Sequence, residues 1–137
     1  MWCAHQVGGL FMNICPVETS AAPLPVGPYS QAFWCGELLF VSGQIPVDPK
    51  TGLVCGVTIL EQAPRAIENM ISVLTSQGLG VGSLVKTTVY MRNMDDFSLF
   101  NQIYSSLMGE ARPARSVVAV SGLPKDVLVE IEAVACR

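Results

Sequence analysis

The order in which strand-like and helix-like apolar patterns follow one another constrains this chain more than any other feature of its sequence. Apolar residues recur at steps of three and four from Leu60 to Gln77, and again from Asp95 to Met108. Strand-like segments rich in Val, Ile, Leu and Thr occupy Ser30–Trp34, Leu38–Ser42, Leu84–Arg92, Ser116–Val120 and Val127–Val134. The order strand–strand–helix–strand–helix–strand–strand predicts an α+β domain, with two helices packed on one face of a mixed sheet.

The chain is poor in charge for its size, which indicates self-association. Charged residues make up 14% of the sequence and apolar residues 50%, whereas a typical globular protein has about 25% charged residues. We therefore expect copies of this chain to cover part of its surface. The segment Leu38–Ser42 is almost wholly apolar, which is typical of a strand covered on both faces.

Length and charge exclude several classes of protein. With 137 residues the chain fits one domain. Its net charge of −3 and its scattered basic residues argue against a protein that binds nucleic acid through many phosphate contacts. No apolar run reaches the roughly 18 residues that a membrane-spanning helix needs.

The N-terminal segment has no feature of a targeting signal. Met1–Val17 contains no Lys or Arg, so it lacks the charged start of a secretory signal and the Arg-rich face of a mitochondrial presequence. We expect an extension that is loosely ordered or packed on a neighbouring subunit, in a cytoplasmic protein. Organelle targeting by this extension is unsupported, although the sequence leaves it open.

Cysteine and histidine give no sign of a metal site or of nucleophilic catalysis. The five cysteines form no CxxC pair, and His5 is the single histidine of the chain. We expect the cysteines to be small buried hydrophobic residues in a reducing compartment. A Ser–His or Cys–His mechanism would depend on His5 alone, which lies outside the predicted core.

Two glutamates in the last predicted strand are candidates for proton transfer. Side chains alternate across a strand, so Glu130 and Glu132 share one face while Ile131 lies on the other. This face is either an ordinary solvated surface or part of a cleft in which one carboxyl has a raised pKa and handles a proton.

Three other positions could contribute to the same chemistry. Arg115 precedes a strand in the rigid segment Arg112–Ser116 and is either a surface residue or a bidentate anchor for a carboxylate. Tyr29 follows Pro28 and could offer its hydroxyl to a site, although a partly buried aromatic is equally compatible. Gly43 would let a ligand approach the backbone closely, but a glycine at a strand end is also common.

Six sequence blocks closely resemble the Rid family of reactive intermediate deaminases, also called the YjgF family. The two most specific blocks are PARS at Pro113–Ser116 and LPKDVLVEIEAVA at Leu123–Ala135. The others are GPYSQA (Gly27–Ala32), VSGQIPVDPKTG (Val41–Gly52), VKTTVYM (Val85–Met91) and NMDDF (Asn93–Phe97). The resemblance divides the chain into an N-terminal extension, residues 1–20, and a Rid-like domain, residues 21–137.

The resemblance implies a fold, an assembly and an activity. Members of this family have a chorismate-mutase-like α+β fold and form homotrimers with clefts between neighbouring subunits. Their best-known activity is the hydrolysis of 2-imino acids such as 2-iminobutanoate and 2-iminopropanoate, and of their enamine tautomers, to 2-keto acids and ammonia. The reaction uses no cofactor and no metal. The expected partners are therefore further copies of the chain and small imino and keto acids, not nucleic acid or membrane.

The resemblance also implies a role for individual residues. Arg115 would bind the substrate carboxylate, Glu130 would position the attacking water and shuttle its proton, and Tyr29 would hydrogen-bond near the reacting imine. The backbone at Gly43 would meet the substrate. An imine is already electrophilic, so an oriented water and a proton relay would suffice.

Other positions support the cleft or depart from the family pattern. Asn101 matches a family position that supports the cleft, Ser42 lies beside it, and Glu132 is assigned a structural role. Arg112 replaces a residue that is usually apolar or aromatic, which makes the rim of the cleft more basic and alters the expected substrate range. Val117 replaces a frequent cysteine, which puts thiol-based regulation in doubt.

Two other functions remain open from the sequence. A non-catalytic protein that binds small ligands, or acts as a chaperone, could use the same clefts. An endoribonuclease or translation inhibitor, a role also described for family members, is less favoured, because the chain has no basic patch and no histidine in the predicted domain.

Overall fold

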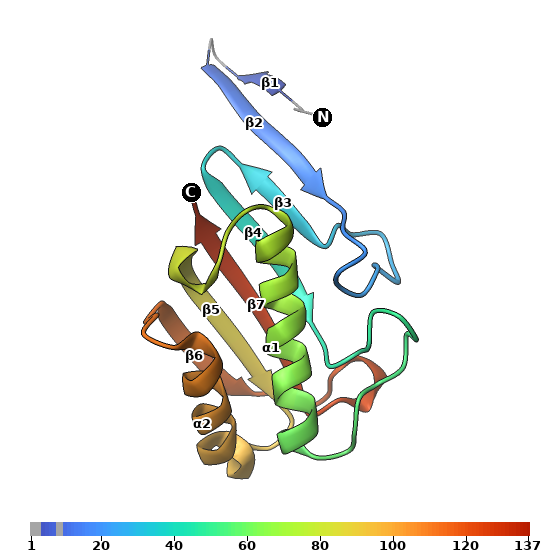
Figure 1. The fold of residues 1–137 in the computed structure, drawn as a ribbon. Coiled ribbons are helices and arrows are strands. Elements are labelled where there is room, and N and C mark those ends of the chain that lie inside the picture. The colour runs from blue at the N-terminus through green and yellow to red at the C-terminus, as the bar shows by residue number, and fades with distance from the viewer. Residues whose placement is uncertain (1–3, 8–9) are drawn as a thin grey trace.

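The structure is a computed structural model that describes residues 4–7 and 10–137 (Figure 1). Its α-helices and strands are β1 (Ala4–Val7), β2 (Leu10–Val17), β3 (Ala32–Cys35), β4 (Leu38–Gln44), α1 (Ile59–Ser76), β5 (Leu84–Met91), α2 (Phe97–Met108), β6 (Ala114–Ala119) and β7 (Val129–Cys136). The predicted order of elements is confirmed from β3 onward. Neither of the two helices in the described part of the chain is long and apolar enough to cross a membrane.

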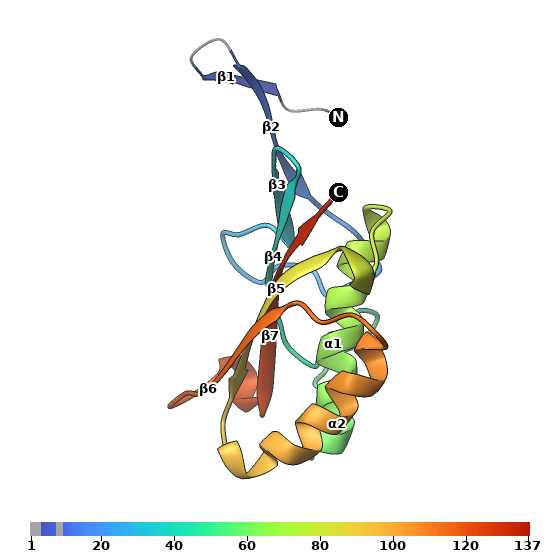
Figure 2. The same cartoon turned by 90° about the vertical axis from the view of Figure 1, so that its left-hand side faces the viewer.

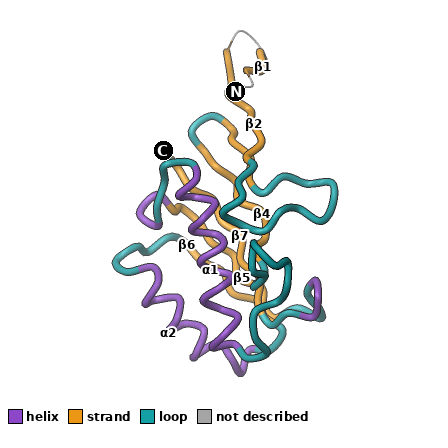
Figure 3. The backbone as a smooth tube through the Cα atoms, turned by 45° about the vertical axis from the view of Figure 1, so that its right-hand side comes forward, coloured by secondary structure: helices purple, strands orange, loops and turns teal. Residues whose placement is uncertain are grey.

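The strands form one mixed sheet in the order β1-β2-β3-β4-β7-β5-β6. Neighbouring strands are antiparallel except β5 and β6, which run parallel. The last strand in sequence, β7, therefore lies in the middle of the sheet between β4 and β5. Both helices lie on one side of this sheet (Figures 2 and 3), which confirms the predicted α+β architecture.

The core lies between the helices and one face of the sheet. The apolar stripe of α1 is fully buried, with Ala63, Ile67, Met70 and Leu74 at 0% exposure. Helix α2 contributes three buried residues to the same core: Phe100, Tyr104 and Met108. Strand β7 alternates buried and half-buried residues along its whole length. The helices therefore cover one face of the sheet. The half-buried residues of β7, which alternate with the buried ones, lie on the other face.

The N-terminal segment corrects one expectation. Residues 14–17 of β2 pair antiparallel with β3, from Ile14 opposite Cys35 to Val17 opposite Ala32. Residues 14–17 thus form an ordered edge of the sheet within the chain, which corrects the expectation of loose order for this part of the extension. The rest of β2 pairs with β1, and this hairpin projects beyond the other strands (Figure 2).

The expectation that Leu38–Ser42 is covered on both faces is wrong for the single chain. In β4, Leu38 is 38% exposed and Phe40 46% exposed, whereas Leu39 and Val41 face the helices and are buried. The face of the sheet opposite the helices, which we call the open face, therefore carries large apolar side chains that this chain does not cover.

The described cysteines are less buried than expected. Cys15, Cys35, Cys55 and Cys136 are half-buried thiols. Cys35 and Cys136 lie at the ends of strands β3 and β7 and Cys55 lies in a loop, whereas Cys15, inside β2, packs against the core. Cys3 and the side chain of His5 lie outside the part of the chain that the structure describes.

Candidate active site

Glu130 and Glu132 project from the middle of the open face. Tyr90 pairs with Glu130 and Thr88 with Glu132 across β5 and β7, and both glutamates are half-buried. The shared face predicted from the sequence is therefore confirmed. Partial burial raises the pKa of the Glu130 carboxyl above its usual value, and the negative charge of Glu132 raises it further. Of the two interpretations of this face, the raised pKa of Glu130 favours the cleft.

Gly43 lies directly against the Glu130 side chain. A Cβ atom built on Gly43 would overlap the Glu130 carboxylate oxygen and would lie 2.8 Å from Cδ. The pairing of β4 with β7 is also irregular between Val41 and Gln44, as at a β-bulge, which re-aims side chains. Glycine is therefore needed at this position, because any larger side chain would displace the Glu130 carboxylate.

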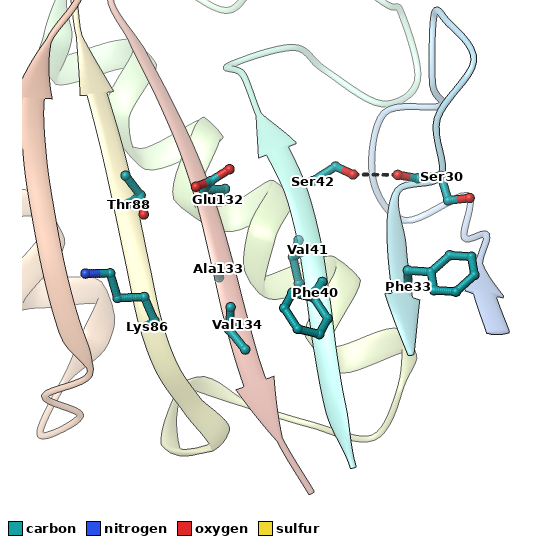
Figure 4. A pocket seen from close by; sticks show the side chains of 10 residues that line it. All are labelled: Ser30, Phe33, Phe40, Val41, Ser42, Lys86, Thr88, Glu132, Ala133 and Val134. Carbon is teal, nitrogen blue, oxygen red and sulfur yellow. Dashed lines mark hydrogen bonds between the residues drawn. The ribbon is translucent and has the colours of Figure 1, made fainter. Parts of the chain in front are cut away.

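Ser42 and Glu132 line a hollow of about 350 Å³ on the open face (Figure 4). The Ser42 hydroxyl donates a hydrogen bond to the Ser30 carbonyl at 2.6 Å. The Tyr90 hydroxyl donates to Glu132 at 3.0 Å, and this bond raises the pKa of Tyr90. Glu132 thus has a hydrogen-bond partner within the sheet.

Tyr29 and Gly43 both line a second cavity of about 300 Å³. The Tyr29 side chain is 51% exposed. The loop before it is held by Gln31, whose buried side-chain amide donates to the carbonyls of Thr19, Ala22 and Pro23. A tethered loop therefore carries an accessible phenol in the cavity that Gly43 also lines.

Arg115 lies on the other side of the sheet, against α2. Its Nη2 donates to the Asn101 side-chain oxygen at 2.8 Å. Its guanidinium also lies over the Tyr104 ring, 4.7 Å from the centroid, and the Tyr104 hydroxyl is hydrogen-bonded to Thr87 at 2.8 Å. Among the described residues, no carboxylate forms an ion pair with Arg115. The guanidinium is thus held in place by neutral groups and keeps its capacity to bind an anion.

The site residues predicted from the sequence therefore form two groups in one chain. Tyr29, Ser42, Gly43 and Glu130 gather on and beside the open face, whereas Arg115 and Asn101 lie on the helix side. The strand register explains the separation: Arg115 pairs with Thr87, and Thr87 pairs with Ala133. Thr87 and Ala133 are buried under the helices, whereas Glu130 lies on the opposite face of β7.

The two departures from the family pattern lie beside Arg115. Arg112 lines the same cavity of about 430 Å³ as Arg115 and Asn101. Its Nη1 donates to the carbonyls of Gly109 at 2.7 Å and Ala111 at 2.8 Å. Val117 follows two residues after Arg115 on the same face of β6 and packs against the core. Arg112 and Arg115 therefore line one cavity in this chain.

Sequence reasoning missed the aromatic platform beneath Arg115. Phe97 and Tyr104 belong to α2, and the Arg115 guanidinium lies 5.9 Å from the Phe97 centroid as well as over Tyr104. The sequence did contain a signal for this platform. Steps of four and three residues place Phe97, Asn101 and Tyr104 on one face of the helix. In the described residues, no group of three or more His, Cys, Asp or Glu side chains is arranged to hold a metal ion.

Comparisons with known proteins give the same assignment over nearly the whole chain. The sequence profile of the family described as Endoribonuclease L-PSP matches residues 19–137. A RutC family protein from Pyrococcus abyssi is 50% identical over 121 residues, which are 88% of this chain and 95% of that protein. The 2-iminobutanoate/2-iminopropanoate deaminase of Salmonella typhimurium is 44% identical over 124 residues, covering 88% of this chain and 96% of the enzyme.

A solved structure extends this similarity to three dimensions. The crystal structure of Escherichia coli TdcF with bound serine matches with a TM-score of 0.86 at 40% sequence identity, covering 90% of this chain and 98% of that chain. The chain belongs to the Endoribonuclease L-PSP family, which is the Rid or YjgF family that its motifs resemble.

Proposed function

We propose that this protein hydrolyses 2-imino acids and their enamine tautomers to 2-keto acids and ammonia. The observation that carries the proposal is Glu130, a half-buried carboxyl with a raised pKa, packed against Gly43, which lines one cavity together with the exposed Tyr29. A carboxyl tuned in this way is suited to general acid–base catalysis. The deaminase name of the Salmonella relative supports the same reaction class.

In the proposed mechanism Glu130 acts on water. Its carboxylate accepts a proton from a water molecule as the water oxygen bonds to the imine carbon. The proton then passes to the nitrogen, which gives a tetrahedral carbinolamine. Glu130 next transfers the proton of the new hydroxyl to the nitrogen, the C–N bond breaks as the C=O bond forms, and ammonia and the 2-keto acid leave. Tyr29 hydrogen-bonds near the imine, and Arg115 binds the carboxylate so that the imine carbon faces the water.

We propose further that each site is completed by a second copy of the chain. Arg115 and Glu130 lie on opposite faces of the sheet, so one chain cannot place both around one small substrate. The open face also exposes Phe33, Phe40 and Val118, and apolar patches of this kind are typical of interfaces. A homotrimer with clefts between neighbours, as the family resemblance implies, would bring the two groups together.

The activity is tested by keto-acid release. Threonine dehydratase would generate 2-iminobutanoate in place, with semicarbazide as the competing trap for the imine. We expect the purified protein to raise the rate at which 2-oxobutanoate forms. Binding without turnover, seen as ligand-induced thermal stabilisation with no rate enhancement, would contradict the proposal and favour a ligand-binding protein.

Subunit mixing tests the shared site. We expect Arg115→Ala and Glu130→Gln proteins to have strongly reduced activity alone and to regain activity when they are co-expressed with different tags. If each site takes Glu130 from one subunit and Arg115 from its neighbour, random mixing in equal amounts restores about a quarter of the sites. Activity that stays at background in mixed oligomers would contradict a shared site.

Replacing Gly43 tests the positioning of Glu130. Gly43 does not have a positive φ, so alanine fits the backbone and the effect of Gly43→Ala comes from displacing the Glu130 carboxylate. We expect kcat to fall about 100-fold, as is typical when a catalytic group moves by about 1 Å. Gly122→Ala is the matched control, because a Cβ at Gly122 meets nothing within 4 Å. Equal activity of the two variants would rule out this positioning role.

A further inference from the structure

The cavity beside Arg115 carries two positive charges and no negative one. It lies between α2 and residues 111–115, and both Arg112 and Arg115 line it. No Asp or Glu side chain is among the residues that line it, although the chain as a whole has a net charge of −3. Two guanidiniums in one cavity create a local field that favours an anion of more than one charge.

Arg112 is held so that part of its guanidinium stays available. Its Nη1 donates to the Gly109 and Ala111 carbonyls, just beyond the end of α2 at Met108. Among the hydrogen bonds of the described residues, none occupies its Nε or Nη2 donors. A guanidinium has five N–H donors in a fixed planar fork, so the remaining ones can bind a carboxylate while the carbonyls fix the side chain.

Arg112 and Arg115 are close enough to bind one small ligand. They are three residues apart, so their Cα atoms lie within about 10 Å of each other even in a fully extended chain. Arg115 is fixed by Asn101 and Tyr104, and neither it nor Arg112 forms an ion pair with a described carboxylate. A molecule with two carboxylates can therefore occupy both arginines.

We propose that Arg112 is a specificity-determining residue that binds a second carboxylate, so that the preferred substrates are dicarboxylic 2-imino acids. This inference rests on the proposed deaminase function. Arg115 binds the carboxylate beside the imine carbon, and Arg112 binds the carboxylate at the end of the side chain. The reaction is unchanged: water adds to the C=N carbon, and a dicarboxylic 2-keto acid and ammonia are released.

The test compares two imines in the same trapping assay. 2-Iminoglutarate would be generated from glutamate by an amino acid oxidase, and 2-iminobutanoate from threonine by a dehydratase. We expect wild-type kcat/KM to favour 2-iminoglutarate, and Arg112→Gln to lower this preference about tenfold or more, as for one charge-assisted hydrogen bond. Arg112→Lys, which keeps the positive charge, should retain part of the preference for 2-iminoglutarate. Arg65→Gln, on α1 with an exposed ion pair to Glu68, is the matched control.

A second measurement separates failure of this inference from failure of the proposed function. We expect 2-oxoglutarate to stabilise the wild type against thermal unfolding more than 2-oxobutanoate does, and Arg112→Gln to remove the difference. An unchanged substrate ratio in Arg112→Gln, or an equal loss with both imines, would overturn the role of Arg112 and leave the deaminase intact. No turnover of either imine by the wild type would overturn the deaminase, and with it this inference.

Discussion

Glu130→Gln is expected to lower kcat by two to four orders of magnitude, the usual contribution of a general acid–base group. Glutamine keeps the size of the side chain and its contact with Gly43, but it cannot accept the proton of the attacking water. The folded structure should be retained, because Glu130 is half-buried and its ionised form is disfavoured there. Single-turnover keto-acid release and the thermal unfolding midpoint would be measured together.

The dependence of kcat/KM on pH that Glu130 causes has a definite direction. The pKa of Glu130 is raised, so the carboxylate form that the reaction needs is lost as the pH falls through a value above about 4.3, the ordinary pKa of glutamate. We expect the acidic limb of kcat/KM to lie above that value. Glu132→Gln removes the neighbouring charge and should shift the limb to lower pH, whereas the Tyr90 hydrogen bond can persist.

Two outcomes would contradict this role of Glu130. A Glu130→Gln protein with turnover close to the wild type would exclude it as the proton-transfer group. An acidic limb that Glu132→Gln leaves in place would show that another group controls the protonation step.

Arg115→Ala is expected to lower kcat/KM by about 100-fold, from the loss of a charge-assisted carboxylate contact and of substrate orientation. Part of the loss should appear in KM, because the carboxylate is bound in the ground state as well as in the transition state. Arg115→Lys should recover only a fraction of the activity, because lysine lacks the planar fork that pairs with a carboxylate.

A control must separate the loss of substrate binding in Arg115→Ala from the loss of the contacts that Arg115 makes with α2. Asn101 and Tyr104 hold the guanidinium, so truncation could also loosen α2. Far-UV circular dichroism and the unfolding midpoint would reveal such a change, and Arg65→Ala controls for the loss of a cation elsewhere on the surface. Wild-type KM in a folded Arg115→Ala protein would exclude Arg115 as the carboxylate anchor.

Local patterns in the sequence predicted most of the secondary structure. The three- and four-residue spacing of Ala63, Ile67, Met70 and Leu74 placed α1, and alternation placed Glu130 and Glu132 on one face. These predictions were correct because helix and strand periods depend on neighbouring residues only. The segment Ile14–Val17 was missed as a strand, because its pairing with β3 is a contact between distant parts of the chain.

The sequence by itself determined the order of elements, the helix-facing stripe, the shared face of the two glutamates and the family. Only the tertiary structure decided that β7 lies between β4 and β5, which sets Gly43 against Glu130 and puts Arg115 on the opposite side of the sheet. Strand order and register arise from pairing across long sequence separations, which no local period encodes. The exposure of Phe40 has the same origin, since an apolar strand does not specify whether its own chain or another copy covers its second face.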